Sequence, residues 1–324
     1  MSSSEIPAAR QGPMTWQRAT LLEADGLVRL DDACLDEMRA VAQELTAHPL
    51  PTEALTTADY EMPKTYAAMR NLRETLVDGV GFGIIERIPV EDMTAAAATQ
   101  IYWLMMSALG RPVAQKWDGT MVYDVLDTGR TPAPGNGVRS SKSNRGQGYH
   151  TDNAFNTPPE FVGLFCIRPA LKGGLSGLIS MDSVYNQMLA RFPNQVERLF
   201  EPFIFDRQRE HAPDDELINK RPMFTRDGDV LEVCLSTDLV RQAHAMSETP
   251  LDETTNDTLA ALDAVMEDDT LGKTFAFEAG QIQVLNNRRL GHRRTAFQDW
   301  PEAQRRRHLV RIWLRDEGRR SYHG

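Results

Sequence analysis

The sequence is poor in cysteine and in positive charge, and each shortage narrows the class of protein. Only three of the 324 residues are cysteine, and Cys34, Cys166 and Cys234 lie far apart and form no CxxC pair. This pattern predicts reduced thiols in a cytoplasmic protein and excludes a disulfide framework or a cysteine zinc site. The 46 acidic residues outnumber 36 basic ones, and a net charge of −10 argues against a nucleic acid or a membrane surface as partner.

Long apolar runs are lacking as well. No stretch reaches the length of a membrane span, and the N-terminal residues do not show the basic and then apolar pattern of a signal peptide. With 41% hydrophobic residues, the chain can still bury a sizeable core. We therefore expect a soluble globular protein whose partner is a small molecule, and the sequence leaves a homo-oligomer open.

The first third of the chain has mainly helical patterns. Residues 1–18 are rich in Ser, Pro, Gly and Gln and predict a loose N-terminal arm. A largely helical part then runs over about residues 19–118. Apolar periodicity, acidic N-terminal residues and Pro or Gly ends predict its elements, which are helices over 31–48, 65–77 and 90–109 and a strand over 80–89.

From about residue 119 onward, short strand patterns dominate. They are expected over 120–126, 161–168, 175–181, 223–235 (a hairpin turning at Asp227-Gly228), 274–278, 281–285, 290–294 and 307–314, with helical patterns over 183–200 and 252–266. Many short strands interrupted by one helical segment indicate a mixed α+β protein. We predict one domain over residues 19–324, with a double-stranded β-helix (jelly-roll) core over about 119–315, flanking helices and a helical and loop insert over about 183–270.

The chemistry is concentrated in the segment Gly148-Tyr149-His150-Thr151-Asp152. An imidazole and a carboxylate two residues apart share one face of an extended strand, and together they suit a divalent metal. His292 is the candidate third ligand, because it lies inside a late strand pattern and a jelly roll brings early and late strands together. The three side chains would form the two-histidine, one-carboxylate set of non-haem iron oxygenases.

Two arginines share a face of the last predicted strand. Alternation with a period of two places Arg307 and Arg311 together with Leu309 and Trp313. They either form the solvated face of an edge strand or point into the barrel. In the second case each guanidinium needs a fixed anion, because it cannot discard its charge.

Taken in order, these motifs resemble those of the Fe(II)/2-oxoglutarate-dependent taurine and 2,4-dichlorophenoxyacetate dioxygenases (TauD/TfdA), which include clavaminate-synthase-like enzymes. The resemblance covers about residues 78–315, which is 238 of 324 residues. The matching features are Tyr149-His150-Thr151-Asp152 with Phe155, Gly173-Gly174-Leu175-Ser176, His292-Arg-Arg-Thr295 with Phe297, Arg306-Arg307-His308-Leu309 with Arg311, and Gly81-Phe82-Gly83 with Pro89.

The resemblance implies cofactors and roles. His150, Asp152 and His292 would bind Fe(II), and the cosubstrates would be 2-oxoglutarate and O2. Arg307 and Ser176 would hold 2-oxoglutarate, and Arg311 would grip an anionic group of the substrate. Further candidate substrate contacts are Asn153, beside the metal motif, and Arg145, in the basic loop that precedes it.

The expected reaction is hydroxylation of an unactivated C–H bond in a small anionic or amino-acid-like molecule, with release of succinate and CO2. Asp152 favours hydroxylation or desaturation over halogenation, because halogenases of this class lack the carboxylate. Two other hypotheses stay open on the same fold. One is a cupin-like metalloenzyme that does not use 2-oxoglutarate, and the other is a non-catalytic barrel that binds a small molecule.

Overall fold

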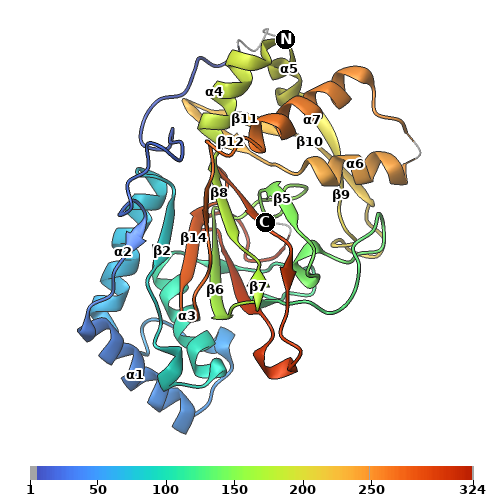
Figure 1. Ribbon diagram of the computed structural model, residues 1–324. Coiled ribbons are helices and arrows are strands. Elements are labelled where there is room, and N and C mark those ends of the chain that lie inside the picture. The colour runs from blue at the N-terminus through green and yellow to red at the C-terminus, as the bar shows by residue number, and fades with distance from the viewer. Residues whose placement is uncertain (1–5, 248, 323–324) are drawn as a thin grey trace.

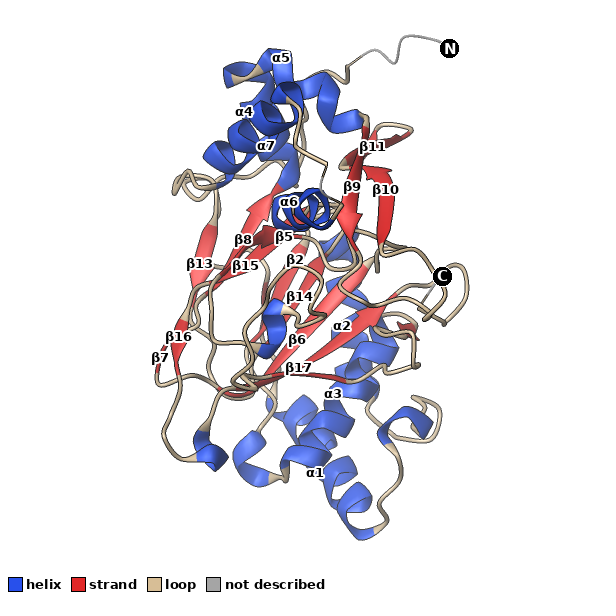
Figure 2. Ribbon diagram, turned by 90° about the vertical axis from the view of Figure 1, so that its right-hand side faces the viewer, coloured by secondary structure: helices blue, strands red, loops and turns tan. Residues whose placement is uncertain are grey.

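Two β-sheets form the centre of the protein (Figures 1 and 2). The structure is a computed structural model that describes residues 6–247 and 249–322. The larger sheet has the order β1-β2-β14-β6-β17-β3, with β4 also paired to β17, and the smaller has the order β13-β8-β15-β5. Residues of both sheets line one small cavity between them. The predicted mixed α+β class and jelly-roll core are confirmed.

The strands of each sheet come from distant parts of the chain. The larger sheet contains β1 (Leu27–Val28), β2 (Phe82–Ile85), β3 (Pro112–Val113), β4 (Tyr123–Val125), β6 (Phe161–Arg168), β14 (Ile282–Asn286) and β17 (His308–Leu314). The smaller sheet contains β5 (Gln147–His150), β8 (Ser176–Ser180), β13 (Lys273–Phe275) and β15 (Leu290–Arg294). Two-stranded pairs are β9 (Pro202–Asp206) with β10 (Ile218–Pro222), β11 (Phe224–Asp227) with β12 (Val230–Val233), and β7 (Lys172–Gly173) with β16 (Phe297–Gln298).

Three helices, α1 (Asp32–Ala47), α2 (Pro63–Val77) and α3 (Ala95–Leu109), cover one face of the larger sheet (Figure 1). Their apolar side chains and those of β6, β14 and β17 form one core. The helix α3 packs very closely on β6, because a Cβ atom at Gly163 would lie 2.4 Å from the Tyr102 hydroxyl oxygen. A larger residue at position 163 would force the buried Tyr102 and Met106 side chains to shift.

One helix boundary differs from the prediction. Residues Val90–Asp92 form a 3-10 turn, and α3 starts only after Thr94, whose side chain accepts a hydrogen bond from the Ala97 amide. This threonine cap satisfies one of the free N–H groups of the first helical turn, so the helix starts after Thr94 and not at the acidic pair upstream. The other 3-10 turns are Thr52–Ala54, Ser140–Lys142, Glu197–Phe200 and Ala303–Arg305.

The insert lies at the opposite end of the protein from α1 (Figures 1 and 2). It contains α4 (Met181–Arg191), α5 (Pro193–Val196), α6 (Thr237–Met246) and α7 (Glu253–Met266). The helical pattern over 183–200 is interrupted at Phe192, and α5 begins at Pro193. The predicted hairpin is confirmed, but its two-residue turn is Gly228-Asp229, one position later than expected. The pair β9–β10 and the helix α6 were not predicted.

The N-terminal arm is not loose over its described part, residues 6–18, so this expectation is wrong there; residues 1–5 lie outside the described residues. Met14 and Trp16 are buried. Backbone carbonyls of the arm accept hydrogen bonds from α4 and its cap: Ser183 Oγ donates to Trp16 at 2.6 Å and Tyr185 Oη to Pro7 at 2.5 Å. Burial of Met14 and Trp16, together with the hydrogen bonds from α4, stabilises the arm enough to offset the entropy lost when it is ordered. The Ser and Pro content alone had suggested disorder.

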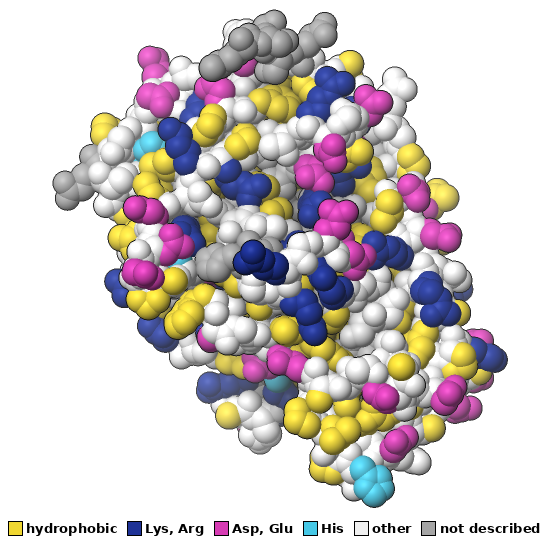
Figure 3. Space-filling view, turned by 180° about the vertical axis from the view of Figure 1, so that it is seen from behind, with side chains coloured by type: hydrophobic (Ala, Val, Ile, Leu, Met, Phe, Trp, Pro, Cys, Tyr) yellow, Lys and Arg dark blue, Asp and Glu magenta, His cyan; other side chains and the backbone are white. Residues whose placement is uncertain are grey.

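Surface features agree with the composition. Acidic and basic side chains are intermingled over the face seen from behind (Figure 3). In the described part of the chain, every helix is too short or too polar to span a bilayer. Cys34, Cys166 and Cys234 are buried free thiols.

Candidate metal centre and its two cavities

Pairing between β5 and β15 brings the two histidines together. His150 is the last residue of β5 and lies opposite His292 in the antiparallel register, although the two are 142 positions apart in the sequence. Directly opposed residues on neighbouring strands project from the same face of a sheet. Their ring centroids are 4.2 Å apart. The expectation that the fold joins these two residues is confirmed.

Asp152 reaches the histidines from a turn, not from the strand. The strand ends at His150, because the Thr151 amide donates to Leu235 and the Asp152 amide donates to Asn287 Oδ1 at 2.7 Å. Asn153 then adopts a left-handed conformation with φ of 58°. The predicted extended strand through Asp152 is therefore wrong, although the predicted proximity holds.

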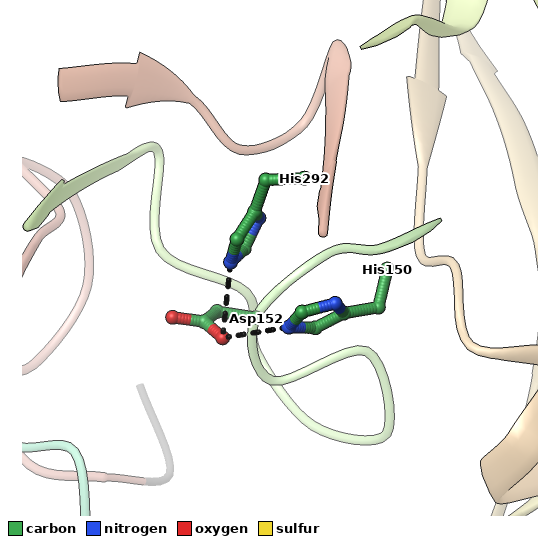
Figure 4. Close-up of side chains that lie close together, drawn as sticks. All are labelled: His150, Asp152 and His292. Carbon is green, nitrogen blue, oxygen red and sulfur yellow. Dashed lines mark ion pairs between the residues drawn. The ribbon is translucent and has the colours of Figure 1, made fainter. Parts of the chain in front are cut away.

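The two histidine side chains point toward one oxygen of the Asp152 carboxylate (Figure 4). Asp152 Oδ1 lies 3.6 Å from His150 Nε2 and 3.9 Å from His292 Nε2. One potential ligand atom from each residue lies within 4.8 Å of the other two. Among the described residues, this is the one group of His, Cys, Asp and Glu side chains that could hold a metal ion.

The protonation states suit a divalent metal. Burial, followed by the neighbouring His150, lowers the pKa of His292 to about 3, so its imidazole is neutral at physiological pH. Burial alone would raise the pKa of Asp152, but Arg311 and the two histidines hold it well below its usual range. The His150 ring is oriented by the Gly148 carbonyl, 3.0 Å from Nδ1, which leaves Nε2 facing the site. Two imidazoles and a carboxylate are a donor set that fits Fe(II).

A small cavity of about 50 Å³ lies on one side of these residues and contains Arg307 and Ser176. The Arg307 side chain is only 5% exposed, which rules out the solvated-edge interpretation. Burial lowers the pKa of Arg307 to about 10, and its Nη1 atom has no hydrogen-bond partner among the described residues. A buried cation with an unused donor fits a carboxylate in this cavity. Ser176 also lines it, but Ser176 Oγ donates to Gln283 Oε1 at 2.6 Å.

The small cavity also contains Arg294, which sequence reasoning missed. Burial lowers the pKa of this arginine to about 9. Its guanidinium donates to the carbonyls of Ser140 at 3.3 Å and Ser143 at 2.9 Å, so it ties the loop before β5 to β15. Its position at the end of the Leu290-Gly-His-Arg-Arg run was visible, but the sequence does not show which of several arginines faces inward.

A larger cavity of about 340 Å³ lies on the other side of the metal residues and contains Arg311, Asn153 and Arg139. Arg311 is buried and already engaged: Nε donates to Gln115 Oε1 at 2.7 Å and Nη1 to Asp152 Oδ1 at 3.1 Å. Its Nη2 atom is buried and finds no hydrogen-bond partner within the described part of the chain. One N–H group of Arg311 is therefore unused by the described residues.

The structure does not bring Arg145 into either cavity. Arg145 is exposed, and the basic residue that this loop contributes to the larger cavity is Arg139. Arg139 is 9% exposed and pairs with Glu210 at 3.0 Å. The difference arises because Arg139 precedes a 3-10 turn that folds inward, whereas Arg145 follows it at the surface.

Sequence reasoning also missed Asn287. This residue is fully buried, and its Nδ2 atom donates to the carbonyls of Asp152 at 3.0 Å and Pro159 at 3.2 Å. With the bond from the Asp152 amide, it holds the turn that carries the metal carboxylate. An Asn-Asn pair directly after a buried strand was the available signal.

A jelly roll that places a carboxylate and two imidazoles beside a buried arginine defines the class of non-haem Fe(II)- and 2-oxoglutarate-dependent oxygenases. The sequence comparison agrees with this class. A model of the taurine catabolism dioxygenase TauD, TfdA family matches residues 43–313. The chain belongs to this family and is an Fe(II)- and 2-oxoglutarate-dependent oxygenase, as the sequence predicted.

Similar proteins span nearly the whole chain. FR-33289 synthase of Streptomyces rubellomurinus is 22% identical over 96% of this chain and 91% of its own length. The taurine hydroxylase-like protein SAT17 of Stachybotrys chartarum is 25% identical over 91% of this chain and 76% of its own.

Solved structures share the fold. Asparagine oxygenase with Fe(II), 3-hydroxyasparagine and succinate has a TM-score of 0.64 at 19% identity, covering 89% of this chain and 93% of its own. The non-haem iron oxygenase OrfP with iron and α-ketoglutaric acid has a TM-score of 0.65 at 18% identity, covering 90% and 94%.

Proposed function

We propose that His150, Asp152 and His292 bind Fe(II) and that Arg307 binds the distal carboxylate of 2-oxoglutarate in the small cavity. The observation that carries this proposal is the buried guanidinium of Arg307, whose Nη1 atom has no partner among the described residues, in a cavity that His150 and His292 also line. Ser176 assists once its hydroxyl turns from Gln283 to the cosubstrate. Bound there, the metal with 2-oxoglutarate and O2 supplies the oxidising power for C–H hydroxylation.

The substrate occupies the larger cavity, and we assign it to small molecules with an anionic group and an amino-acid-like character. Arg311 and Arg139 supply positive charge at the metal end. The lining contributed by α6, by α7 and by the residue that follows α7 contains the acidic residues Asp238, Asp263 and Glu267. An anionic group toward the arginines and an amine toward the helices satisfy both ends of this cavity. Asparagine oxygenase and OrfP, whose structures contain hydroxylated asparagine and arginine, act on molecules of this shape.

The chain's own residues then do three things. Arg311 holds the anionic group through its remaining N–H edge, and Asn153 lines the cavity beside the metal carboxylate. The insert helices cover the site and keep water from the reacting C–H bond.

The buried free thiols fit a reducing compartment, so we place the enzyme in the cytoplasm.

The test is a substrate screen on iron-loaded protein. Amino acids, sulfonates, phosphonates and aryloxyacids are each added with 2-oxoglutarate and O2, and succinate is measured together with the mass of the organic product. We expect one anionic class to stimulate succinate release and to gain one oxygen atom. Asp152→Ala is the control and should release none.

Two outcomes would contradict the proposal. Conversion of a substrate that does not depend on 2-oxoglutarate would favour a cupin-like metalloenzyme. Tight binding of a small molecule without succinate release, in protein that demonstrably holds iron, would favour a non-catalytic barrel.

A further inference from the structure

The two oxygens of the Asp152 carboxylate have different surroundings. Oδ1 faces the two imidazole nitrogens (Figure 4). Oδ2 accepts a hydrogen bond from the indole Nε1 of Trp313 at 2.7 Å and lies 3.0 Å from Arg311 Nη1. The orientation of the carboxylate is therefore set by the hydrogen bonds that Trp313 and Arg311 donate to it, and not by the histidines.

These donors come from the larger sheet, whereas the histidines come from the smaller one. Arg311 and Trp313 are two positions apart on β17 and share a face. Trp313 lies opposite Val162 on β6 and Val113 on β3, and its side chain is only 2% exposed. An indole packed on both neighbouring strands has one orientation available, so its N–H group points at a fixed place.

We propose that Trp313 is a positioning residue for the metal centre. Its indole N–H donates a hydrogen bond to Oδ2, so that only Oδ1 faces His150 and His292. The carboxylate then cannot bind a metal through both oxygens. This keeps a position at the metal free for the reactants. The inference rests on the proposed Fe(II) site and adds a residue that the sequence motifs do not contain.

The physical reason concerns rotation about the Asp152 side chain. A carboxylate held by Arg311 alone can exchange its oxygens, because Arg311 Nη1 lies within 3.1 Å of Oδ1 and 3.0 Å of Oδ2. Only the indole distinguishes the two oxygens. Hydrogen-bond partners of metal-ligating carboxylates commonly change metal affinity by about 10- to 100-fold when they are removed.

The experiment replaces Trp313 by Phe, which keeps an aromatic ring and removes the N–H group. Co(II) serves as the probe, because its visible absorbance reports both affinity and coordination number without any turnover. We expect the Kd for Co(II) to rise about 10- to 100-fold in Trp313→Phe. The absorbance should also change in shape and intensity, as expected for a carboxylate that can engage through both oxygens.

The chain offers two matched controls. The buried Trp16 donates its indole N–H to the Val80 carbonyl at 2.8 Å, and the buried Trp103 donates to the Leu55 carbonyl at 3.0 Å. Trp16→Phe and Trp103→Phe lose an equivalent hydrogen bond without a metal-ligand partner. Both should bind Co(II) like the wild type, with an unchanged spectrum.

A second variant covers the case in which Trp313→Phe does not fold. β-(3-Benzothienyl)alanine at position 313 keeps the bicyclic shape of tryptophan and lacks the N–H group, and it should give the same loss of Co(II) affinity. Wild-type affinity and spectrum in this variant would overturn the positioning role while leaving the metal site intact. If Asp152→Ala also bound Co(II) like the wild type, the proposed metal site itself would be wrong.

Discussion

The two cavities that meet at the metal residues are built from different parts of the fold. The small cavity is lined mainly by strands of the two sheets, with His292 and Arg294 from β15 and Ser176 from β8. The larger cavity is lined by the loop before β5, the turn after it and the helices α6 and α7 of the insert. In the proposed assignment, strands of the two sheets form the cosubstrate side, and loops and insert helices form the substrate side.

Their charges differ in the same way. In the small cavity Arg307 is buried with an unused donor, so the site is incomplete without an anion. Arg311, which lines both cavities, is paired with Asp152, and Arg139 of the larger cavity is paired with Glu210. We therefore expect the small cavity to bind a carboxylate more strongly than the larger cavity binds an anionic group. The predictions below test this difference.

The largest effect is expected where both cavities meet. Asp152→Ala removes the carboxylate on which both histidines converge, and Fe(II) affinity should fall by at least about 100-fold. Anaerobic Fe(II) titration measures this loss, and His244→Ala, which changes a surface histidine of α6, is the control. Undiminished Fe(II) binding in Asp152→Ala would show that Asp152 is not a metal ligand and would contradict the proposed metal centre.

The next effect separates the two cavities. Arg307→Ala should weaken 2-oxoglutarate binding by about 2–5 kcal/mol, or roughly 30-fold and more, because a buried charge pair loses one partner. Arg307→Lys should recover only part of this affinity, since the planar fork is lost. Calorimetry with 2-oxoglutarate measures the loss, and Arg168→Ala, at the outer end of β6, should bind like the wild type.

A pH dependence should come from the enclosed histidine. The pKa of His292 is about 3 in the folded protein and near 6.5 when unfolded, so between these values only the unfolded chain takes up the proton. The free energy of unfolding of metal-free protein should then fall as pH drops from about 6 to 4, by up to about 1.4 kcal/mol per pH unit for one proton. Denaturant unfolding of wild type and His292→Gln tests this, and equal slopes in both proteins would contradict it.

The smallest effect concerns the larger cavity. Burial raises the pKa of Glu210, which nevertheless pairs with Arg139 and reduces the positive charge available to a substrate. Glu210→Gln should therefore lower the KM of an anionic substrate, by roughly fivefold if about 1 kcal/mol is gained. The affinity for 2-oxoglutarate should not change. A higher KM in Glu210→Gln would mean that Glu210 itself contacts the substrate.

Much of the fold could be predicted because local patterns were strong. The strands over residues 161–168 and 290–294 have the predicted bounds, and the first helix starts after the predicted cap Asp31. Arg307 precedes β17, which starts at His308, but it lines the same small cavity as Arg311, and its burial decided between the two interpretations. These features depend on neighbouring residues, which a sequence displays directly.

The remaining features depend on distant partners. The turn at Asp152 is set by Asn287, 135 positions later, and the arm at Trp16 is held by Ser183 of α4. Trp313 looked like an apolar strand residue, and only the structure places its N–H group on the metal carboxylate. Such long-range contacts leave no periodic signal in the sequence. Sequence patterns therefore predicted the identity of the site residues more reliably than the hydrogen bonds that position them.

The division between the two cavities is tested most directly by anaerobic titration of iron-loaded protein with 2-oxoglutarate. The charge-transfer absorbance of the iron–cosubstrate complex is followed in wild type, Arg307→Ala, Glu210→Gln and Asp152→Ala. The account predicts a saturable band in the wild type, the same midpoint in Glu210→Gln, a midpoint at least about 30-fold higher in Arg307→Ala, and no band in Asp152→Ala. Equal midpoints in wild type and Arg307→Ala, or a band that survives in Asp152→Ala, would contradict it.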